Sequence, residues 1–596
     1  MAEASVLLLQ LPLQPGCAFE PTGNIPLAPG RLAAAAGLQT RAVMPADQCD
    51  SLSDREILSH IIDRKPDVLG FTLYMWNAER SSWLSRQVRK ALPSVFTVCG
   101  GPEVTRDNRW LRESGAFHLM VEGEGEPFAA ALNDPEQLHV LAERNSGFTS
   151  VGRCIFLPNH WPDPYFTGHL DSAWNMPAHV ETIRGCPHMC SYCAYRRISP
   201  VPRVTPSEIV LETLTLHRNA GRTDLVFLDP TFNGRRDLSA VLAGMEGMGF
   251  SCFGEVRAGQ PDLDAGAFAG AGFESVEVGL QTMNPGVLGT LGRSDNPEDT
   301  IRGALSLKAA GVEPVVDLIL GLPEDDPEGI LRAGGRLVSE GLGEGVQAFF
   351  LSVLPGTRLR GESARFGLAF MDRPPYWVTG LPGITEHDLM NARDELGGIL
   401  GFDLDMEPRP ILCDSWPHTS VLDTGSCFEP VFTGRHAVLR VRGSGLWENR
   451  HRILSAVGKR FEDDPFCVLD VVLQADERFP VDLLPLITGV VRPLDYHDRS
   501  AKMLGRHGRL RTAVIAGFDA DPNWLTACAS ESVTVVPWKR LRQVPAELLE
   551  RNVGLLLEGS PDLSRLSRTF SAHRELVFFR NMEMERLWCV SVLELG

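Results

Sequence analysis

Three cysteines, Cys186, Cys190 and Cys193, are the residues whose type and spacing most clearly indicate chemistry in this chain. They form a CxxxCxxC loop within the segment 181–197. Three thiolates on one short loop can bind three irons of a four-iron, four-sulfur cubane and leave the fourth iron open. A ligand can then chelate that iron through an amino and a carboxylate group. The triplet therefore predicts a cluster that takes part in a reaction.

A structural zinc site is the alternative for this loop, with His188 as a fourth ligand. Structural zinc sites generally pair two CxxC half-sites across a longer span. No second half-site lies near the triplet. A zinc-stabilised binding module is therefore the competing class of protein, and it would be colourless and contain zinc when purified in air.

The triplet follows a short expected strand, and Tyr192 stands directly before the third cysteine. This arrangement resembles the radical S-adenosylmethionine (SAM) superfamily, in which this aromatic residue packs near the adenine. The resemblance implies that the turn containing Asp229, Thr231 and Asn233 binds the methionine amino group of SAM. It also implies that the segment 318–323 forms the strand that flanks the adenine.

Two further strands agree with this resemblance. Glu255 and Arg257 are two residues apart and share one face of a strand, where they could hold an ammonium and a carboxylate. An ordinary ion pair at the strand end is the alternative for these two residues. The strand with Glu277, Gly279 and Gln281 closely resembles the ribose-binding strand of the family. The missing side chain of Gly279 should leave room there for a ligand.

Two glycine-rich loops in the N-terminal part resemble the cobalamin-binding domain of cobalamin-dependent radical SAM enzymes. Glycines in such loops let the backbone approach a broad corrin edge closely. The residues that the resemblance implies in cobalamin binding are Gly100, Gly101, Pro102, Glu103, Gly123 and Glu124. A nucleotide-binding or ligand-free Rossmann-like domain is the alternative.

The chain lacks the DxHxxG motif that supplies a cobalt-ligating histidine in methionine-synthase-like domains. Another residue must therefore occupy the lower face of the cobalt. The loop after the third expected strand contains Thr72, Tyr74 and Trp76, and the Trp76 indole could exclude water from that face. A tryptophan here resembles the carbapenem-biosynthesis methylases of the TokK and ThnK type. Packing at a domain interface is the alternative role for Trp76.

These resemblances imply a cobalamin-dependent radical SAM C-methyltransferase with a 4Fe-4S cluster, SAM and cobalamin as cofactors. SAM would donate the methyl group and would also give the radical that removes hydrogen from an unactivated sp3 carbon, so no general base is needed. The implied substrate is a small molecule, a pantetheinylated carbapenam that is methylated sequentially in antibiotic biosynthesis, and the implied reductant is a flavodoxin or ferredoxin. A cobalamin-dependent oxidation or ring rearrangement is the alternative reaction.

The elements that must position these residues alternate between strands and helices. In the N-terminal part, a helix is expected over 78–91, and strands are expected at 5–11, 40–44, 67–73 and 96–99, with another ending near residue 121. Such alternation predicts a parallel sheet with helices on both faces, which binds ligands at the carboxyl ends of its strands.

A second series of β/α units follows. Its strands are expected at 182–183, 225–228, 251–256, 275–280, 315–320 and 348–351. Helices are expected over 206–220 and 297–310, the latter with Asn296 as its cap and Pro297 at its first position. Six such units predict a partial barrel whose open edge admits a large substrate.

The expected fold class is therefore α/β, with four parts along the chain. They are a Rossmann-like cobalamin-binding domain (1–145), a linker (146–180), a radical SAM partial barrel (181–365) and a mixed α+β substrate-binding or capping domain (366–596). The last part contains several tryptophans but no motif.

Composition restricts the partners and the compartment. The chain has 57 Lys and Arg against 76 Asp and Glu, a formal net charge of −19, which argues against a nucleic-acid partner. No run of about 18 apolar residues is present, so we expect no membrane-spanning segment. The 13 cysteines are mostly isolated, unlike a secreted disulfide framework, and this favours the reducing cytoplasm.

Overall fold

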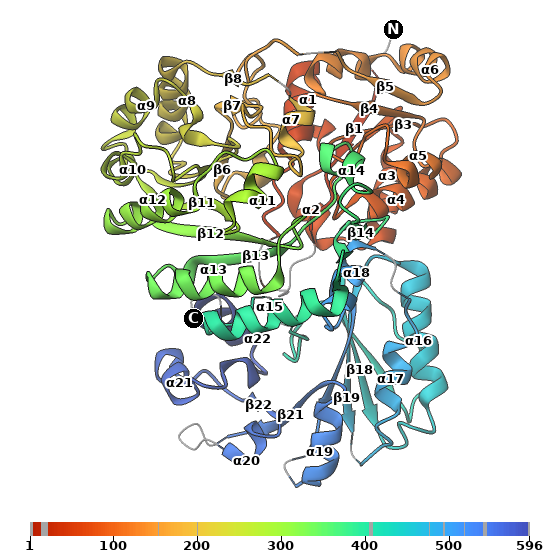
Figure 1. The fold of residues 1–596 in the computed structure, drawn as a ribbon. Coiled ribbons are helices and arrows are strands. Elements are labelled where there is room, and N and C mark those ends of the chain that lie inside the picture. The colour runs from red at the N-terminus through yellow and green to blue at the C-terminus, as the bar shows by residue number, and fades with distance from the viewer. Residues whose placement is uncertain are drawn as a thin grey trace. The chain divides into compact units, whose positions relative to one another are not determined.

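The computed structural model describes residues 4–13, 19, 22–152, 154–199, 201–404, 409–475, 477–492, 495–517, 519–539 and 545–593. The chain forms two compact units (Figure 1). Unit 1 comprises Met1–Leu11, Gly23–Asp47 and Arg64–Asp405, and unit 2 comprises Pro12–Thr22, Gln48–Asp63 and Met406–Gly596.

Unit 1 begins with a five-stranded parallel sheet. Its strands are, in spatial order, β1 (Val6–Leu9), β2 (Val68–Thr72), β3 (Phe96–Gly100), β4 (Leu119–Glu122) and β5 (Phe148–Ser150). All five residues of β2 are buried, as expected for a parallel strand covered on both faces. The accompanying helices are α1 (Leu27–Ala36), α4 (Ala78–Ala91), α5 (Arg109–Glu113), the 3-10 helix η2 (Glu126–Asn133) and α6 (Pro135–Arg144). The helix predicted over 78–91 is confirmed, whereas β5 lies in the stretch predicted as a linker.

The strand predicted at 40–44 is wrong in all but one residue. Thr40–Ala42 forms a 3-10 turn, η1, and only Val43 makes a parallel bridge, to Leu8 of β1. Leu8 also pairs with β2, so this bridge lies on the opposite edge of β1. The chain therefore switches sides of β1 before it enters β2. Open α/β sheets bind their ligands beside such a switch point.

The second sheet of unit 1 is the partial barrel. Its six parallel strands are, in spatial order, β13 (Val346–Phe350), β12 (Glu313–Leu320), β11 (Phe273–Gln281), β10 (Ser251–Val256), β9 (Asp224–Phe227) and β6 (Ala178–Val180). The intervening helices are α8 (Ser207–Asn219), α9 (Leu238–Met245), α10 (Ala265–Gly270), α11 (Pro285–Thr290), α12 (Pro297–Ala309) and α13 (Pro327–Ser339). The predicted cap of α12 is confirmed, because the side chain of Asn296 accepts a hydrogen bond from the Glu298 N–H.

The first barrel strand was predicted at 182–183, and this is wrong. That strand is β6, which ends at Val180. The chain then leaves the sheet because the carboxylate of Asp229 accepts the N–H groups of Thr182 and Ile183, at 2.6 and 2.7 Å. Ile183–Arg184 instead forms β7, which pairs antiparallel with β8 (Arg203–Val204). The short helix α7 (Tyr195–Ile198) lies between these two strands in the sequence.

A small antiparallel sheet and one long helix complete unit 1. The elements that follow the barrel are α14 (Arg358–Glu362), β14 (Ala369–Phe370), β15 (Val378–Leu381), β16 (Ile384–Thr385) and α15 (Glu386–Leu400). The side chains of Thr385 and Asp388 form a capping box at the start of α15. All of these elements except α14 fall in the stretch predicted to belong to the C-terminal domain (366–596).

Unit 2 contains a seven-stranded sheet whose adjacent strands are all parallel, so the stretch predicted as a mixed α+β C-terminal domain (366–596) combines this parallel sheet with the antiparallel sheet β14–β16 of unit 1. Its strands are, in spatial order, β17 (Thr419–Asp423), β18 (His436–Gly443), β19 (Val468–Ala475), β20 (Leu510–Ile515), β21 (Val533–Trp538), β22 (Gly554–Leu557) and β23 (Val577–Phe579). Buried charges interrupt its apolar runs, as where Asp470 pairs with Arg511 at 2.8 Å. Those charges conceal the pattern of a parallel strand.

The helices of unit 2 alternate with its strands. They are α3 (Asp54–Arg64), α16 (Arg450–Asp463), α17 (Leu483–Thr488), α18 (Tyr496–Met503), α19 (Pro522–Ala529), α20 (Ala546–Leu549), α21 (Leu563–Thr569) and α22 (Met582–Trp588), while α2 (Ala46–Ser51) crosses between the units. In the described ranges of either unit, no helix combines the length and the apolar character needed to span a membrane.

Candidate functional site

The cysteine loop lies at the carboxyl ends of barrel strands β9 and β10. All three cysteines are half-buried. The thiol of Cys186 bonds the side chain of Thr231, which follows β9. Burial, and then the neighbouring thiols Cys190 and Cys186, raise the pKa of Cys193 to about 12. The three thiols are thus gathered in one small region, as the ligands of a cluster must be.

The same loop does not have the arrangement of a mononuclear metal site. Nowhere in the described part of the chain do three or more His, Cys, Asp or Glu side chains converge so that they could hold one metal ion. A zinc knuckle that uses His188 needs such convergence, whereas a cubane takes each thiol at a different iron.

Three carboxyl groups share the inner face of the barrel beside this loop. Glu255 of β10 pairs in register with Glu277 of β11. Asp317 of β12 pairs with Gly279, two residues further along β11 and therefore on the same face. The alternate residues Val276 and Val278 point to the opposite face, into the hydrophobic core. We call Glu255, Glu277 and Asp317 the acidic ladder.

Two members of the acidic ladder, Asp317 and Glu255, have raised pKa values because they are buried next to other carboxyl groups. Burial, then the charge of Glu277 and a hydrogen bond to it, raise the pKa of Asp317 to about 9. Burial and the charge of Glu277 raise the pKa of Glu255 to about 7. Oδ1 of Asp317 and Oε1 of Gln281 are buried and have no hydrogen-bond partner. These oxygens are available to the hydroxyl or ammonium groups of a ligand.

Gln281 and Gly279 of β11, which the sequence also suggested for SAM binding, lie in more constrained surroundings than their sequence pattern indicated. Gln281 adopts a left-handed backbone conformation (φ 69°) at a β-bulge of β11, and such strain is often retained at functional sites. The space beside Gly279 is not open, because a Cβ there would lie 3.2 Å from the Arg293 guanidinium and also against the amide of Gln281.

Arg257 does not form the ion pair with Glu255 that was the alternative role for these two residues. Its guanidinium pairs with Asp295, and Arg293 pairs with the same carboxylate at 2.6 Å. Arg293 Nη1 also lies 3.4 Å from the hydroxyl of Tyr192. This chain of contacts connects the aromatic residue of the cysteine loop to the ends of β10 and β11.

The turn after β9 is mainly occupied by contacts within the protein. The carboxylate of Asp229 is fully buried and bonds Thr182 and Ile183, so it fixes the entry to the cysteine loop. The side-chain amide of Asn233 donates to the carbonyl of Arg257 at 3.0 Å. Among the residues predicted to bind the amino group of SAM, Thr231 is the one whose side chain contacts a cysteine of the loop, through its hydroxyl group.

In the N-terminal sheet, the loop after β2 forms a turn of stacked aromatic rings. The rings of Tyr74 and Trp76 are 4.5 Å apart and nearly parallel. Asn77, fully buried, accepts the N–H of Tyr74 at 2.9 Å and donates to the carbonyls of Leu11 and Thr72 at 2.8 and 3.2 Å. This aromatic turn comes directly after β2, the neighbour of β1 in the sheet. It therefore lies beside the switch point, where a ligand is expected.

The loop after β3 packs against the start of the aromatic turn. Gly101 has a φ of 106°, and a Cβ at this position would lie 2.6 Å from the Leu73 carbonyl oxygen, so only glycine fits there. The carbonyl of Pro102, which follows Gly100 and Gly101, accepts a hydrogen bond from Arg197 at 2.7 Å. The loop is therefore fastened to the helix that follows the cysteines.

Glu103 is buried and contacts protein groups. Its carboxylate accepts hydrogen bonds from the Tyr376 hydroxyl at 2.5 Å and from Asn108 at 3.0 Å. Burial raises its pKa to about 7, although the bond from Tyr376 opposes this shift. Glu103 thus connects the loop to the segment that follows the barrel, a role that its position in a glycine-rich motif did not reveal.

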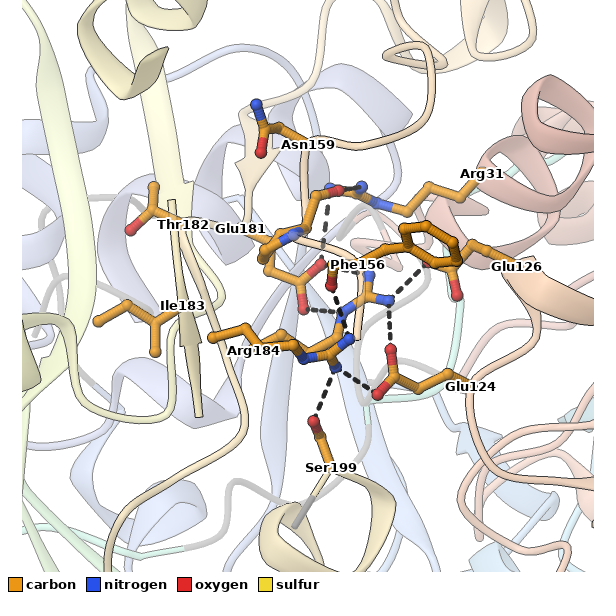
Figure 2. Close-up of polar contacts among 12 residues, drawn as sticks. Arg31, Glu124, Glu126, Phe156, Asn159, Glu181, Thr182, Ile183, Arg184 and Ser199 are labelled. Atoms are coloured by element: carbon orange, nitrogen blue, oxygen red, sulfur yellow. Dashed lines mark hydrogen bonds and ion pairs between the residues drawn. The ribbon is translucent and has the colours of Figure 1, made fainter. Parts of the chain in front are cut away.

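The loop after β4 contacts the cysteine loop through charged groups (Figure 2). Gly123 has a φ of 105°, and Glu124 forms ion pairs with Arg184, at 3.0 Å, and with Arg203. Neither arginine was identified from the sequence. Tyr195 was also missed: its hydroxyl bonds Glu255, and it lies near Tyr74.

A parallel α/β sheet with an aromatic turn at its carboxyl edge, joined to a partial barrel with a three-cysteine loop, defines a class of protein with two cofactor-binding domains. Comparison with known families agrees with this class. Residues 180–333 match the Radical SAM superfamily and residues 32–133 match the B12 binding domain. The chain therefore contains a radical SAM domain and a B12-binding domain, and these two domains imply a 4Fe-4S cluster, SAM and cobalamin as cofactors.

Curated relatives are similar over part of their length. The cobalamin-dependent radical SAM methyltransferase TokK of Streptomyces tokunonensis is 26% identical over 59% of this chain and 55% of its own. The 2-(S-pantetheinyl)-carbapenam-3-carboxylate methyltransferase of Streptantibioticus cattleyicolor is 24% identical over 61% of this chain and 56% of its own. The chain thus spans about half the length of these relatives.

A solved structure is also similar. It is that of the radical SAM methyltransferase TsrM from Kitasatospora setae with cobalamin and a 4Fe-4S cluster bound. The TM-score is 0.48 at 15% identity, over 61% of this chain and 75% of that one.

Proposed function

We propose that the chain is a C-methyltransferase that acts on an unactivated sp3 carbon of a small molecule. The observation that carries this proposal is that both predicted cofactor sites belong to unit 1 and are connected side chain to side chain. Glu124, in the loop after β4 of the N-terminal sheet, forms ion pairs with Arg184 and Arg203, which flank the cysteine loop. A radical formed at one cofactor can therefore react close to the other.

The residues of the chain have separate roles in this proposal. Cys186, Cys190 and Cys193 would hold the cluster. The acidic ladder and Gln281 would bind the hydroxyl and cationic groups of SAM, and Trp76 would keep water from the lower face of cobalamin. When bound, the cluster supplies the electron that cleaves SAM and cobalamin supplies the methyl group. The protein contributes orientation and exclusion of water, and it needs no general base because hydrogen leaves as an atom.

For the substrate, we propose a pantetheinylated carbapenam that is methylated sequentially. The support is the similarity to the carbapenam methyltransferase, at 24% identity. We further propose that a flavodoxin or ferredoxin of the cytoplasm supplies the electrons. Buried cysteines such as Cys99, Cys252 and Cys413 are free thiols, which agrees with a reducing compartment.

Anaerobic reconstitution with iron, sulfide and cobalamin, followed by mass spectrometry, tests the proposal. With SAM, a reductant and a pantetheinylated carbapenam, the product should gain one CH2 unit for each methyl transfer, together with 5'-deoxyadenosine. Cys190→Ala should form neither product. A product without added CH2 would show oxidation or ring rearrangement instead. Normal SAM cleavage by Cys190→Ala would contradict the assignment of the cluster.

A further inference from the structure

The cysteine loop has a neck that is made by two arginines. Arg184 and Arg203 are opposite residues of the β7/β8 hairpin. The residues between them, 185–202, include all three cysteines. Whatever holds these two arginines therefore determines where the loop leaves and re-enters the barrel.

One carboxylate of the N-terminal sheet contacts both arginines. Oε2 of Glu124 pairs with Nη1 of Arg184 at 3.0 Å (Figure 2), and Oε1 of Glu124 pairs with Nη2 of Arg203. Glu126, two residues later in the same loop, pairs with Arg184 at 2.8 Å. A single turn after β4, within the B12-binding domain, thus binds both arginines of the neck.

The surrounding contacts leave no free charge in this network. Glu181 forms two hydrogen bonds with Arg184, at 2.8 and 2.6 Å, and pairs with Arg31 at 3.6 Å. Three carboxylates therefore face three guanidinium groups, and none of these side chains is more than 16% exposed. Against the cost of burial, Arg184 holds the pKa of Glu181 below its usual value. The carboxylate of Glu124 is consequently not available to a ligand.

We propose that Glu124 is a positioning residue that fixes the distance between the cluster and the cobalt, rather than a contact of cobalamin. Both oxygens of one rigid carboxylate bind the two sides of the neck, so the cysteine loop cannot shift without breaking an ion pair. Gly123 sits next to Glu124 with a φ of 105°, on the loop predicted to border the corrin. The corrin edge and the neck are then held by adjacent residues of one turn.

The proposal rests on the presence of the two cofactors and not on methyl transfer, and it can be tested without substrate. The full chain is loaded with cobalamin and cluster, both are brought to their paramagnetic states, and the distance between cobalt and cluster is measured by pulsed electron paramagnetic resonance. Glu124→Gln removes the charge but keeps the shape of the side chain. Glu122→Gln is the matched control, because that carboxylate bonds Ser150, at 2.8 Å, and not the neck.

The wild type and Glu122→Gln should give a single narrow distance, and Glu124→Gln should lose it while it retains iron and cobalamin. If Glu124→Gln does not take up the cluster, Arg203→Lys is measured instead, because lysine keeps the positive charge but lacks the planar guanidinium group. This variant should also lose the single narrow distance. An unchanged narrow distance in the variant that can be loaded would overturn the proposal. Failure to find a methylated product would not alter this distance, so the two proposals can fail separately.

Discussion

At the scale of single residues, the acidic ladder is the feature whose energetics depend most on pH. Neighbouring carboxyl groups in a buried place cannot all ionise cheaply, so some retain protons near neutral pH. The pKa of Asp317 is raised to about 9 and that of Glu255 to about 7. A bound cation, or a ligand that donates hydrogen bonds, would favour the ionised forms. Binding of SAM should therefore be coupled to proton release.

The ladder predicts that the apoprotein becomes less stable as pH rises. Because burial and Glu277 raise the pKa of Asp317 to about 9, its carboxyl group is mostly protonated in the folded state below about pH 8, whereas an unfolded aspartate loses its proton near pH 4. The folded state thus binds more protons across this window, so the free energy of unfolding falls as pH rises, by at most about 1.4 kcal/mol per pH unit for one proton. Asp317→Asn should flatten this dependence in urea unfolding followed from pH 5 to pH 8.

Glu274→Gln is the control for this measurement, because Glu274 is an exposed residue of the neighbouring strand β11. Its pH dependence should match that of the wild type. Equal slopes for the wild type and Asp317→Asn would mean that Asp317 is ionised in the folded protein.

Residue types and spacing singled out the cysteines, Glu255 and Glu277 as candidates, because each stands in a short local pattern, and the structure places the two glutamates in register on neighbouring strands. Asp317 was missed although it is the only charged residue within an otherwise apolar stretch of β12. A buried charge in such a strand is itself a functional signal. The pairing of Arg184 and Arg203 with Glu124 could not be predicted, since it joins loops of two different sheets.

At the scale of elements, strands bounded by turns were predicted well and strands next to irregular backbone were not. β10 and the helix over 78–91 have clear periodicity and the predicted bounds. The wrong strand predictions at 40–44 and 182–183 have a tertiary cause. Thr40–Ala42 forms a 3-10 turn in place of strand hydrogen bonds. At 182–183, the backbone N–H groups donate to the Asp229 carboxylate and not to a neighbouring strand. Neither interaction is visible in local sequence.

The aromatic turn predicts a second measurable effect. Asn77→Ala removes three hydrogen bonds that shape the turn, two of them buried, and each buried group left without a partner costs about 1–3 kcal/mol. We expect a lower free energy of unfolding and weaker cobalamin binding, because Trp76 loses its fixed place. Asn145→Ala is the control, since its amide bonds only the carbonyl of Leu141 within the exposed end of α6. The measurements are urea unfolding and spectroscopic titration with cobalamin, and parity between the two variants would exclude this role.

At the scale of the whole molecule, the two units share the chain in an interleaved order. The N-terminal segments 12–22 and 48–63 belong to unit 2, although more than 300 residues separate them from the rest of that unit. The Asp54 carboxylate accepts the N–H of Phe466 at 2.8 Å, and the Arg55 N–H donates to Asp464 at 2.7 Å. A cut at any single peptide bond therefore cannot separate the units cleanly.

This interleaving predicts the behaviour of a chain that ends at Asp405. The N-terminal sheet and the barrel should still form, because their strands pair only with each other within unit 1. The segment 48–63 should lose its order, because the partners of Asp54 and Arg55, and the Gly434 N–H that bonds Glu56 at 3.1 Å, are absent. Limited proteolysis with mass spectrometry should thus cut the truncated chain within 48–63, where the full chain is protected. Equal resistance of this segment in both chains would show that α3 is held by unit 1 instead.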